Sequence, residues 1–381
     1  MKKKNMLMFF SLIMLVLFFS SITSFSLAQN VALNAHGLEL THVTVAAEDG
    51  QFFGWPANGG AWVWGDEIVV VFKQGKMNLK EKGHLIDRSV PQIDVQARSL
   101  DGGKTWKLEK DYQFVCNENT AKKLEIPIDF KHENFAFRFQ LTGLSGGKSY
   151  FFYSYDRCKT WNGPYEFPLF GEALVSARTC TLIEGTHEMK AFVSGAPQTG
   201  EEFGTHVFLV QTQDGGLNWE KVADVGLPSQ PDQWSIMPSV ARISDNELVC
   251  ALRFNNRNKK ISGNEYWGSL DNGKTWQFRS MLPLGSTPPS LEYLSGDRLV
   301  VLYGQRNGKT PGISVRLSKD RGKTWGDEII FRNDGGSFDL GYTRNIFRSD
   351  GKGVLIYYFT SQTLNADRTI EATIWNPDKI Q

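Results

Sequence analysis

The stretch SLDGGKTW, residues 99–106, occurs five times in slightly varied form. It returns as SYDRCKTW from residue 154, TQDGGLNW from 212, SLDNGKTW from 269 and SKDRGKTW from 318. The starts are 55, 58, 57 and 49 residues apart. Each interval holds enough chain for one four-stranded sheet with its turns, which is the unit of a β-propeller. The repeat therefore predicts an all-β ring of blades.

The chain between the repeats contains short runs rich in β-branched and aromatic residues, such as NELVCALRF (246–254) and DRLVVLYGQ (297–305). Gly, Asn or Asp bounds each run, as is typical of strands joined by turns. After the last repeat, residues 341–376 supply three more strands, so a sixth blade needs a fourth. We predict that residues 40–47 provide it, which gives six four-stranded antiparallel blades and a ring without open edges.

The repeated octapeptide fits a structural turn better than a set of five catalytic centres. Its Asp can accept hydrogen bonds from nearby backbone N–H groups, its Gly can take positive φ, and its Trp can be buried between neighbouring elements. One carboxylate per repeat is too few for a calcium loop of the EF-hand type. The predicted structural aspartates are Asp101, Asp156, Asp214, Asp271 and Asp320.

The N-terminus predicts export. Residues 1–28 carry three lysines, then an apolar run, then the small-x-small pattern Ser26-Leu27-Ala28. These features are typical of a signal peptide cut after Ala28, and the apolar run is short for a membrane anchor. We therefore expect a periplasmic or extracellular protein without a membrane span, formed by residues 29–381 as a single domain.

Composition excludes some partners. The 381-residue chain has 42 Lys and Arg against 41 Asp and Glu, and removal of three leader lysines brings the net charge from +1 to −2. Such a balance provides no basic field for nucleic acid. Four cysteines permit disulfides after export, with their pairing left open, and no His or Cys cluster indicates a metal.

The pattern S-x-D-x-G-x-T-W is similar to the Asp box of the sialidase superfamily, and the resemblance covers essentially the whole mature chain. It implies a sialidase-like six-bladed propeller with its boxes at the turn between the third and fourth strands of each blade. In that family these turns lie on the face away from the active site. Site residues are then expected at the other ends of the strands, between the boxes.

The resemblance implies a catalytic pair. Tyr342, in DLGYTRNIF (339–347), resembles the family's nucleophilic tyrosine, because a neutral phenol suits an anionic sugar better than a carboxylate does. A partly buried tyrosine at a strand start is the alternative. Asp87 resembles in position the family's acid/base, with Asp94 as a poorer rival and a solvated loop residue as the alternative. His84 and Arg88 flank Asp87 and are expected to tune it or to touch substrate.

Arginines are expected to bind the acidic group of the sugar. Arg253 and Arg306 end two predicted second strands at equivalent places, and they resemble two members of the family's carboxylate-binding triad. Arg344, two residues after Tyr342, is the third cationic candidate. For any one of them a surface ion pair is the alternative.

Several positions depart from the family pattern. The family's Arg-Ile-Pro motif is replaced by FFGWPANGGAWVW (52–64), so Trp55 stands where an arginine is expected and is a candidate for stacking on a sugar ring, as are Trp62, Trp64 and Trp234. Met237 replaces the glutamate that serves the tyrosine, and Tyr358 replaces the glutamate that supports the missing arginine. Glu292 is the nearest substitute base. The loss of both the arginine and the glutamate that supports it favours a change to a different acidic substrate.

The sequence thus predicts an exported, monomeric, sialidase-like exo-glycoside hydrolase that acts on a glycan ending in sialic acid or another acidic sugar. It needs no cofactor, because the named side chains and water suffice for hydrolysis. A non-catalytic glycan-binding propeller is the main alternative, and an extracellular interaction scaffold is the third.

Overall fold

A computed structural model of the chain describes residues 28–33, 37–81, 83–110, 114, 117, 119–142, 147–198, 204–283, 287–306, 310–360 and 368–381. The predicted signal peptide, residues 1–28, lies outside the described residues apart from Ala28, and it stays a prediction. No helix in the described part of the chain has both the length and the apolar character needed to cross a bilayer.

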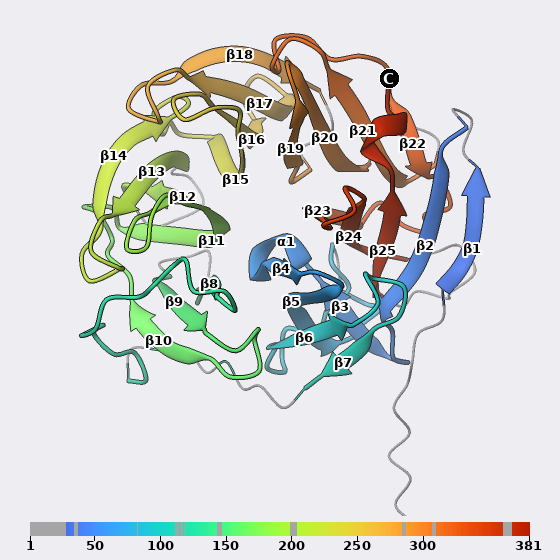
Figure 1. Ribbon diagram of the computed structural model, residues 1–381, viewed down its shortest axis with the longest axis horizontal. Helices are drawn as coiled ribbons and strands as arrows, with labels where there is room; N and C mark the ends of the chain where they lie inside the picture. Colours follow the sequence, from blue (N-terminus) through green and yellow to red (C-terminus); the bar gives the residue numbers. More distant parts are fainter. Residues whose placement is uncertain are drawn as a thin grey trace, which may run out of the picture.

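Six small antiparallel sheets form a ring, as predicted (Figure 1). Blade 1 contains β3 (Gln51–Gly54), β4 (Ala61–Trp64), β5 (Glu67–Lys76), β6 (Ile93–Ser99) and β7 (Lys107–Glu109). Blade 2 contains β8 (Ala136–Leu141), β9 (Ser149–Ser154) and β10 (Asn162–Glu166). Blade 3 contains β11 (Leu174–Ile183), β12 (Met189–Ala196), β13 (His206–Thr212) and β14 (Glu220–Val225).

Blade 4 contains β15 (Gln233–Arg242), β16 (Leu248–Asn256), β17 (Ile261–Ser269) and β18 (Gln277–Leu282). Blade 5 contains β19 (Ser290–Ser295), β20 (Arg298–Gln305), β21 (Gly312–Ser318) and β22 (Ile329–Arg332). Blade 6 contains β23 (Gly341–Phe347), β24 (Gly353–Phe359) and β25 (Thr369–Trp375), then β2 (Glu39–Ala46) and β1 (Ala28–Leu33) from the N-terminal side of the chain. The short helix η1 (Pro377–Lys379) follows β25.

The segment predicted to close the ring does so. β2 pairs antiparallel with β25, with Val43 opposite Ala372, so the two ends of the chain share one blade. Three blades differ from the predicted four strands, and in blade 1 the inner strand is divided into β3 and β4, which both pair with β5. Blade 6 gains β1 as a fifth strand, and blade 2 has three strands among the described residues, because no inner strand pairs with β8.

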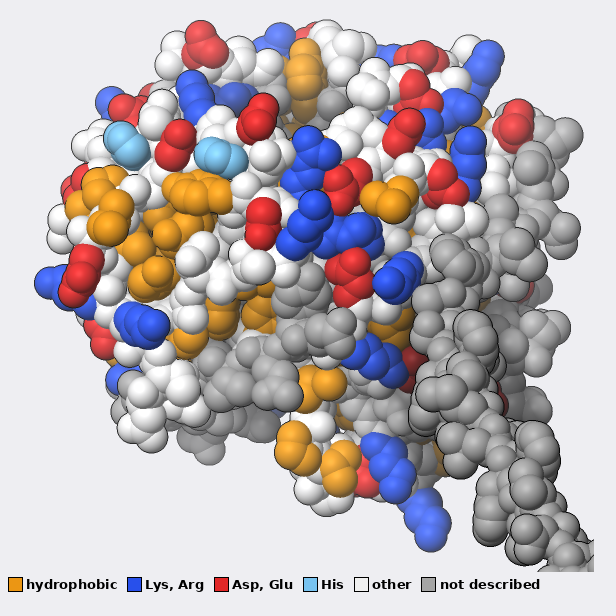
Figure 2. Space-filling model, turned by 60° about the horizontal axis from the view of Figure 1, so that its bottom comes forward, with side chains coloured by type: hydrophobic (Ala, Val, Ile, Leu, Met, Phe, Trp, Pro, Cys, Tyr) orange, Lys and Arg blue, Asp and Glu red, His pale blue; other side chains and the backbone are white. Residues whose placement is uncertain are grey.

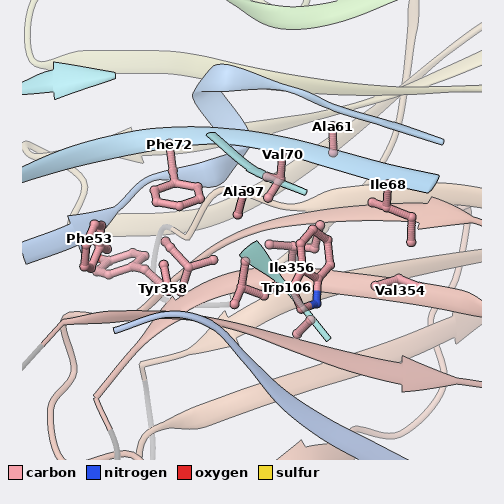
Figure 3. Close-up of a cluster of buried hydrophobic side chains, with 14 of the residues drawn as sticks. Phe53, Ala61, Ile68, Val70, Phe72, Ala97, Trp106, Val354, Ile356 and Tyr358 are labelled. Atoms are coloured by element: carbon pink, nitrogen blue, oxygen red, sulfur yellow. The ribbon is translucent and has the colours of Figure 1, made fainter. Parts of the chain in front are cut away.

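The core lies between blades, because the middle strands of each sheet are covered on both faces. Figure 3 shows the cluster between blades 1 and 6, where side chains of β5 face those of β24. Ile68, Val70, Val354 and Ile356 in this cluster are fully buried. This double burial explains why the sequence of β24, GVLIYYF, is continuously apolar and does not alternate.

The five boxes form the predicted turns. Each follows the next-to-last strand of its blade, so by antiparallel alternation all five lie at one end of the ring. In the first box Asp101 accepts bonds from the backbone N–H groups of Lys104 and Thr105 and from the Thr105 hydroxyl. The Trp106 indole is buried and donates to the Gly103 carbonyl. Gly103 has φ 88°, as its place in the turn requires.

Ion pairs join neighbouring blades at this box end. Glu67 of blade 1 accepts from Arg157 in the box of blade 2, and Glu247 of blade 4 accepts in the same way from Arg321 in the box of blade 5. Figure 2 shows a face on which basic and acidic side chains are interspersed without a continuous field of one sign.

The three described cysteines, Cys158, Cys180 and Cys250, are buried free thiols. Cys116 lies outside the described residues. Burial raises the pKa of Cys180 to about 11 and that of Cys250 well above its usual value, so both thiols stay protonated at neutral pH.

Candidate active site

Irregular inner strands shape the end of the ring opposite the boxes. Pairing shifts register in β11 between Ala177 and Thr181, in β15 between Ile236 and Ser239, and in β23 between Gly341 and Arg344. In blade 1 the helix α1 (Pro56–Gly59) interrupts the inner strand between β3 and β4, and it lies toward the centre of the ring (Figure 1). Such bulges re-aim side chains beside functional sites.

Three residues in or next to these irregular strands have a left-handed backbone conformation. Trp55 has φ 59°, Met237 has φ 57° and Tyr342 has φ 49°. Non-glycine residues rarely hold this conformation, which costs of order 1–3 kcal/mol where it is imposed and is concentrated at functional sites. All three residues belong to one group of contacting side chains. The Trp55 and Tyr342 ring centroids lie 6.5 Å apart.

Three arginines from three other blades surround Tyr342, whose side chain is buried. Arg253, within β16, donates from Nη1 to the Tyr342 hydroxyl over 3.4 Å and to the Met237 sulfur over 3.5 Å. The guanidinium carbons of Arg178, from β11, and Arg306, after β20, lie 5.7 Å and 5.8 Å from the Tyr342 ring centroid. Blades 3, 4, 5 and 6 thus converge on one phenol.

The charges around Tyr342 change its acidity. Burial raises the pKa of Tyr342, but the positive charges of Arg253, Arg178 and Arg306 outweigh burial and hold it below the usual value of 10.0. Burial in turn lowers the pKa of Arg178 to about 10, even though Tyr342 opposes that shift. The arrangement stabilises a phenolate and presents an excess of positive charge to an anionic ligand.

The loop around α1 holds Arg178 in place. Arg178 donates from Nη1 to the side-chain oxygen of Asn58, and the Thr179 hydroxyl bonds the carbonyl of Gly59. A Cβ atom on Gly59 would lie 2.1 Å from the carbonyl oxygen of Val71, so only glycine permits this close approach. The segment that replaces the expected Arg-Ile-Pro motif therefore supports an arginine that comes from another blade.

A buried carboxylate, Asp339, lies beside this group. It accepts bonds from His84 Nδ1 at 2.7 Å, from the Tyr358 hydroxyl at 2.5 Å and from Arg368 Nε at 3.2 Å. Burial raises the pKa of Asp339, but the bond and charge of His84, the Tyr358 hydroxyl and the charge of Arg368 lower it below its usual value. Tyr358 also accepts from Arg306 at 3.2 Å, which links the carboxylate to the arginine group.

The structure brings five of the predicted site residues together. Tyr342, Arg253 and Arg306 form the centre. Trp55 and His84 lie beside them, with a Trp55–His84 ring separation of 5.0 Å and a His84–Tyr342 separation of 6.4 Å.

Asp87 and Arg88 are not joined to Tyr342 by any contact among the described residues. The Asp87 carboxylate accepts from the hydroxyl and the backbone N–H of Ser89, and these bonds lower its pKa. Arg88 is exposed. The rival, Asp94, is buried between Lys73 and Arg138, which hold its pKa down against burial, so it forms part of a structural ion cluster.

Glu292 and Arg344 lie in a second polar group of the inner strands, away from the phenol of Tyr342. Burial raises the pKa of Glu292 to about 7, against the bond from Ser290 and the charge of Arg344. Arg344 donates from Nη1 to the Thr179 carbonyl of blade 3 over 2.9 Å. Neither makes a contact with Tyr342 among the described residues.

Two of the proposed stacking tryptophans are core residues. Trp62 packs on Trp161, with ring centroids 5.4 Å apart, and Trp64 joins the same cluster between blades 1 and 2. Trp234 instead stacks with Arg257. A cavity of about 540 Å³ lined by Trp219 and Phe167 shares no residue with the group around Tyr342.

Two members of the group were missed from the sequence. Arg178 lies within the strand-like run LVSARTCTLI, and its signal was a charged side chain inside an inner strand that is largely buried. Asp339 lies three residues before Tyr342, and nothing in the spacing marked it as a partner of His84. No described cluster of His, Cys, Asp and Glu could hold a metal ion.

Comparisons with known proteins agree with this geometry. The family model for the BNR repeat-like domain matches residues 135–355, more than half of the chain. The chain belongs to this family. A comparison with curated protein sequences gives no match.

Solved structures share the fold. A protein of unknown function from Dyadobacter fermentans has a TM-score of 0.67 and 20% identity, over 88% of this chain and 97% of that one. A Hadza microbial sialidase has a TM-score of 0.60 and 14% identity, over 87% of this chain and 66% of that one. An α-L-arabinofuranosidase of Fusarium graminearum, solved with an iminosugar inhibitor, has a TM-score of 0.58 and 14% identity, over 87% and 98%. The propeller is thus one that glycoside hydrolases of different specificity use.

Proposed function

We propose that this protein is an exported exo-glycoside hydrolase that releases an acidic terminal sugar, a sialic acid or a uronic acid, with Tyr342 as nucleophile. The observation that carries the proposal is the convergence of Arg178, Arg253 and Arg306 on the buried phenol of Tyr342. The sialidases among the structural neighbours support the fold of such an enzyme.

The arginines serve two purposes in this mechanism. They favour the phenolate of Tyr342 over the phenol, and a planar guanidinium suits bidentate binding of the carboxylate of the sugar. The phenolate oxygen forms a bond to the anomeric carbon while the bond from that carbon to the leaving oxygen breaks. Water then displaces the tyrosine and the free sugar leaves.

The first experiment is a screen of the wild-type protein on aryl glycosides of sialic acids, uronic acids and neutral sugars, beside a glycan-binding array. We expect turnover of an acidic substrate, and we expect Tyr342→Phe to lower kcat by several orders of magnitude, because the attacking oxygen is lost while the pocket keeps its shape. Tyr357→Phe is the matched control, since its hydroxyl bonds Thr373 on the neighbouring strand, away from the site.

Two outcomes would contradict the proposal. Binding of a glycan without turnover, unchanged in Tyr342→Phe, would make the protein a glycan-binding propeller. Release of an unsaturated uronic acid, detected by its ultraviolet absorbance, would replace nucleophilic attack by an elimination.

A further inference from the structure

The proposed reaction needs a group that gives and takes a proton, and no carboxylate is free for this beside Tyr342 in the described structure. Asp87 makes no contact with the group, Asp94 is held by Lys73 and Arg138, and Asp339 is occupied by three donors. Met237 lies where the related enzymes are expected to have a glutamate. His84 is a partly exposed side chain that can give and take a proton, and its ring packs against Tyr342.

His84 is fixed in orientation from two sides. Its ring meets the Trp55 ring edge to face at 5.0 Å and 84°, and the Tyr342 ring at 6.4 Å and 79°. Its Nδ1 lies 2.7 Å from Asp339 Oδ1. The side chain keeps 29% of its surface exposed, so the ring is held by its neighbours yet reachable by substrate.

The bond to Asp339 decides which ring nitrogen carries the proton. An ionised carboxylate only accepts hydrogen bonds, so Nδ1 must be the donor. Asp339 stays ionised because its three donors hold its pKa below the usual value against burial. Nε2 is therefore the nitrogen left for the site, and no described residue bonds it. A carboxylate that fixes the tautomer of a histidine in this way is a recurrent arrangement in proton transfer.

We propose that His84 is the acid/base of this site and that Asp339 is its positioning residue. The proposal rests on the function proposed above. In the first step Nε2–H gives its proton to the leaving oxygen as the Tyr342 oxygen bonds the anomeric carbon. In the second step neutral Nε2 takes a proton from the attacking water, the bond from the anomeric carbon to Tyr342 breaks, and the phenolate and imidazolium are restored.

The test compares His84→Gln with wild type on a natural glycan and on its 4-methylumbelliferyl glycoside. Loss of a general acid costs about a hundredfold or more in kcat/KM for a poor leaving group, and much less for an aryl group that leaves without protonation. We expect that difference in His84→Gln. His206→Gln is the matched control, because His206 pairs with Glu172 at 3.3 Å and shares no contact with Tyr342.

The pH profile gives a readout that a purely structural histidine would not move. The groups that face His84 are Asp339 and Tyr342, with Tyr358 and Arg368 behind the carboxylate. If His84 Nε2 transfers the proton, the pH profile of wild-type kcat/KM should lose one limb in His84→Gln. Asp339→Asn should lower kcat/KM more on the natural glycan than on the aryl glycoside, as His84→Gln does, because an amide no longer fixes which ring nitrogen of His84 carries the proton. Thermal melting shows whether each variant is folded.

The outcomes separate the two proposals. Equal losses on both substrates, or an unchanged pH profile in His84→Gln, would overturn the role of His84 while leaving Tyr342 as nucleophile. Absence of any turnover by wild type would overturn both. Nitrogen-15 NMR of the His84 ring adds a check without substrate: a neutral ring protonated on Nε2 would contradict the orientation by Asp339.

Discussion

At the box end of the ring one octapeptide recurs in five blades, whereas at the opposite end the inner strands present different side chains. Asp101 and Asp271 make the same bonds to the Ser and Thr of their own boxes. Trp55, Arg178 and Tyr342, in contrast, are not repeated from blade to blade. Each lies in or beside an inner strand whose pairing is interrupted. Repetition in this fold marks a turn that five of the six blades share, and departure from repetition marks the candidate site.

Several substitutions test this difference between the two ends of the ring, and the largest effect among them is expected at Arg178. Arg178→Met keeps the length of the side chain but removes its charge. A lost hydrogen bond to a charged group costs about 1.5–3 kcal/mol, so KM for an acidic sugar should rise roughly ten- to a hundredfold. KM for a neutral sugar should not rise. Arg298→Met is the control, because Arg298 bonds the Ile380 carbonyl far from this group.

The same variant has a readout without substrate. Arg178 is one of the three charges that lower the pKa of Tyr342, so its removal should raise that pKa. Ultraviolet absorbance at increasing pH reports the phenolate directly. The absorbance change that is lost in Tyr342→Phe identifies the titration of Tyr342. If that change occurs at the same pH in wild type and in Arg178→Met, then Arg178 does not act on Tyr342.

A smaller effect, on stability alone, is expected in the boxes. The Asp271 carboxylate accepts from the hydroxyls of Ser269 and Thr275 and from the Thr275 backbone N–H. Asp271→Ala should lower the free energy of unfolding by about 1–2 kcal/mol, as loss of a capping side chain does, and leave kcat unchanged. Asp245→Ala, in the exposed turn before β16, is the control. A fall in kcat with full stability would show that the boxes take part in the chemistry.

The contribution of the Asp271 carboxylate to stability should change with pH in a known direction. The bonds from the Thr275 hydroxyl and backbone lower the pKa of Asp271 from 3.8 to about 2. A carboxyl with a lower pKa in the folded state stabilises the fold above its unfolded pKa, and this contribution is lost as pH falls through the folded value. Urea unfolding between about pH 4 and pH 2 should therefore show a decline that is smaller in Asp271→Ala than in wild type.

The ring of blades could be predicted from the sequence, because the period of the repeat, the boxes and the strands buried on both faces are local patterns. The sequence also predicted that Arg253 and Arg306 lie beside Tyr342, as they do, and the roles of these residues stay predictions. It did not suffice for Arg178, because a bulge in β11 is not visible in the run LVSARTCTLI. Nor did it predict the pairing of His84 with Asp339, which are 255 residues apart and meet only when the ring closes.

The smallest effect is expected at Asp87, the residue that sequence position favoured as acid/base. Its carboxylate caps the turn at Ser89 and has no described contact with Tyr342. If His84 carries the proton, Asp87→Asn should lower kcat/KM on a natural glycan by far less than the roughly hundredfold that loss of a general acid costs. The ratio of natural to aryl substrate should stay as in wild type. A large loss confined to the natural glycan would return the proton transfer to Asp87.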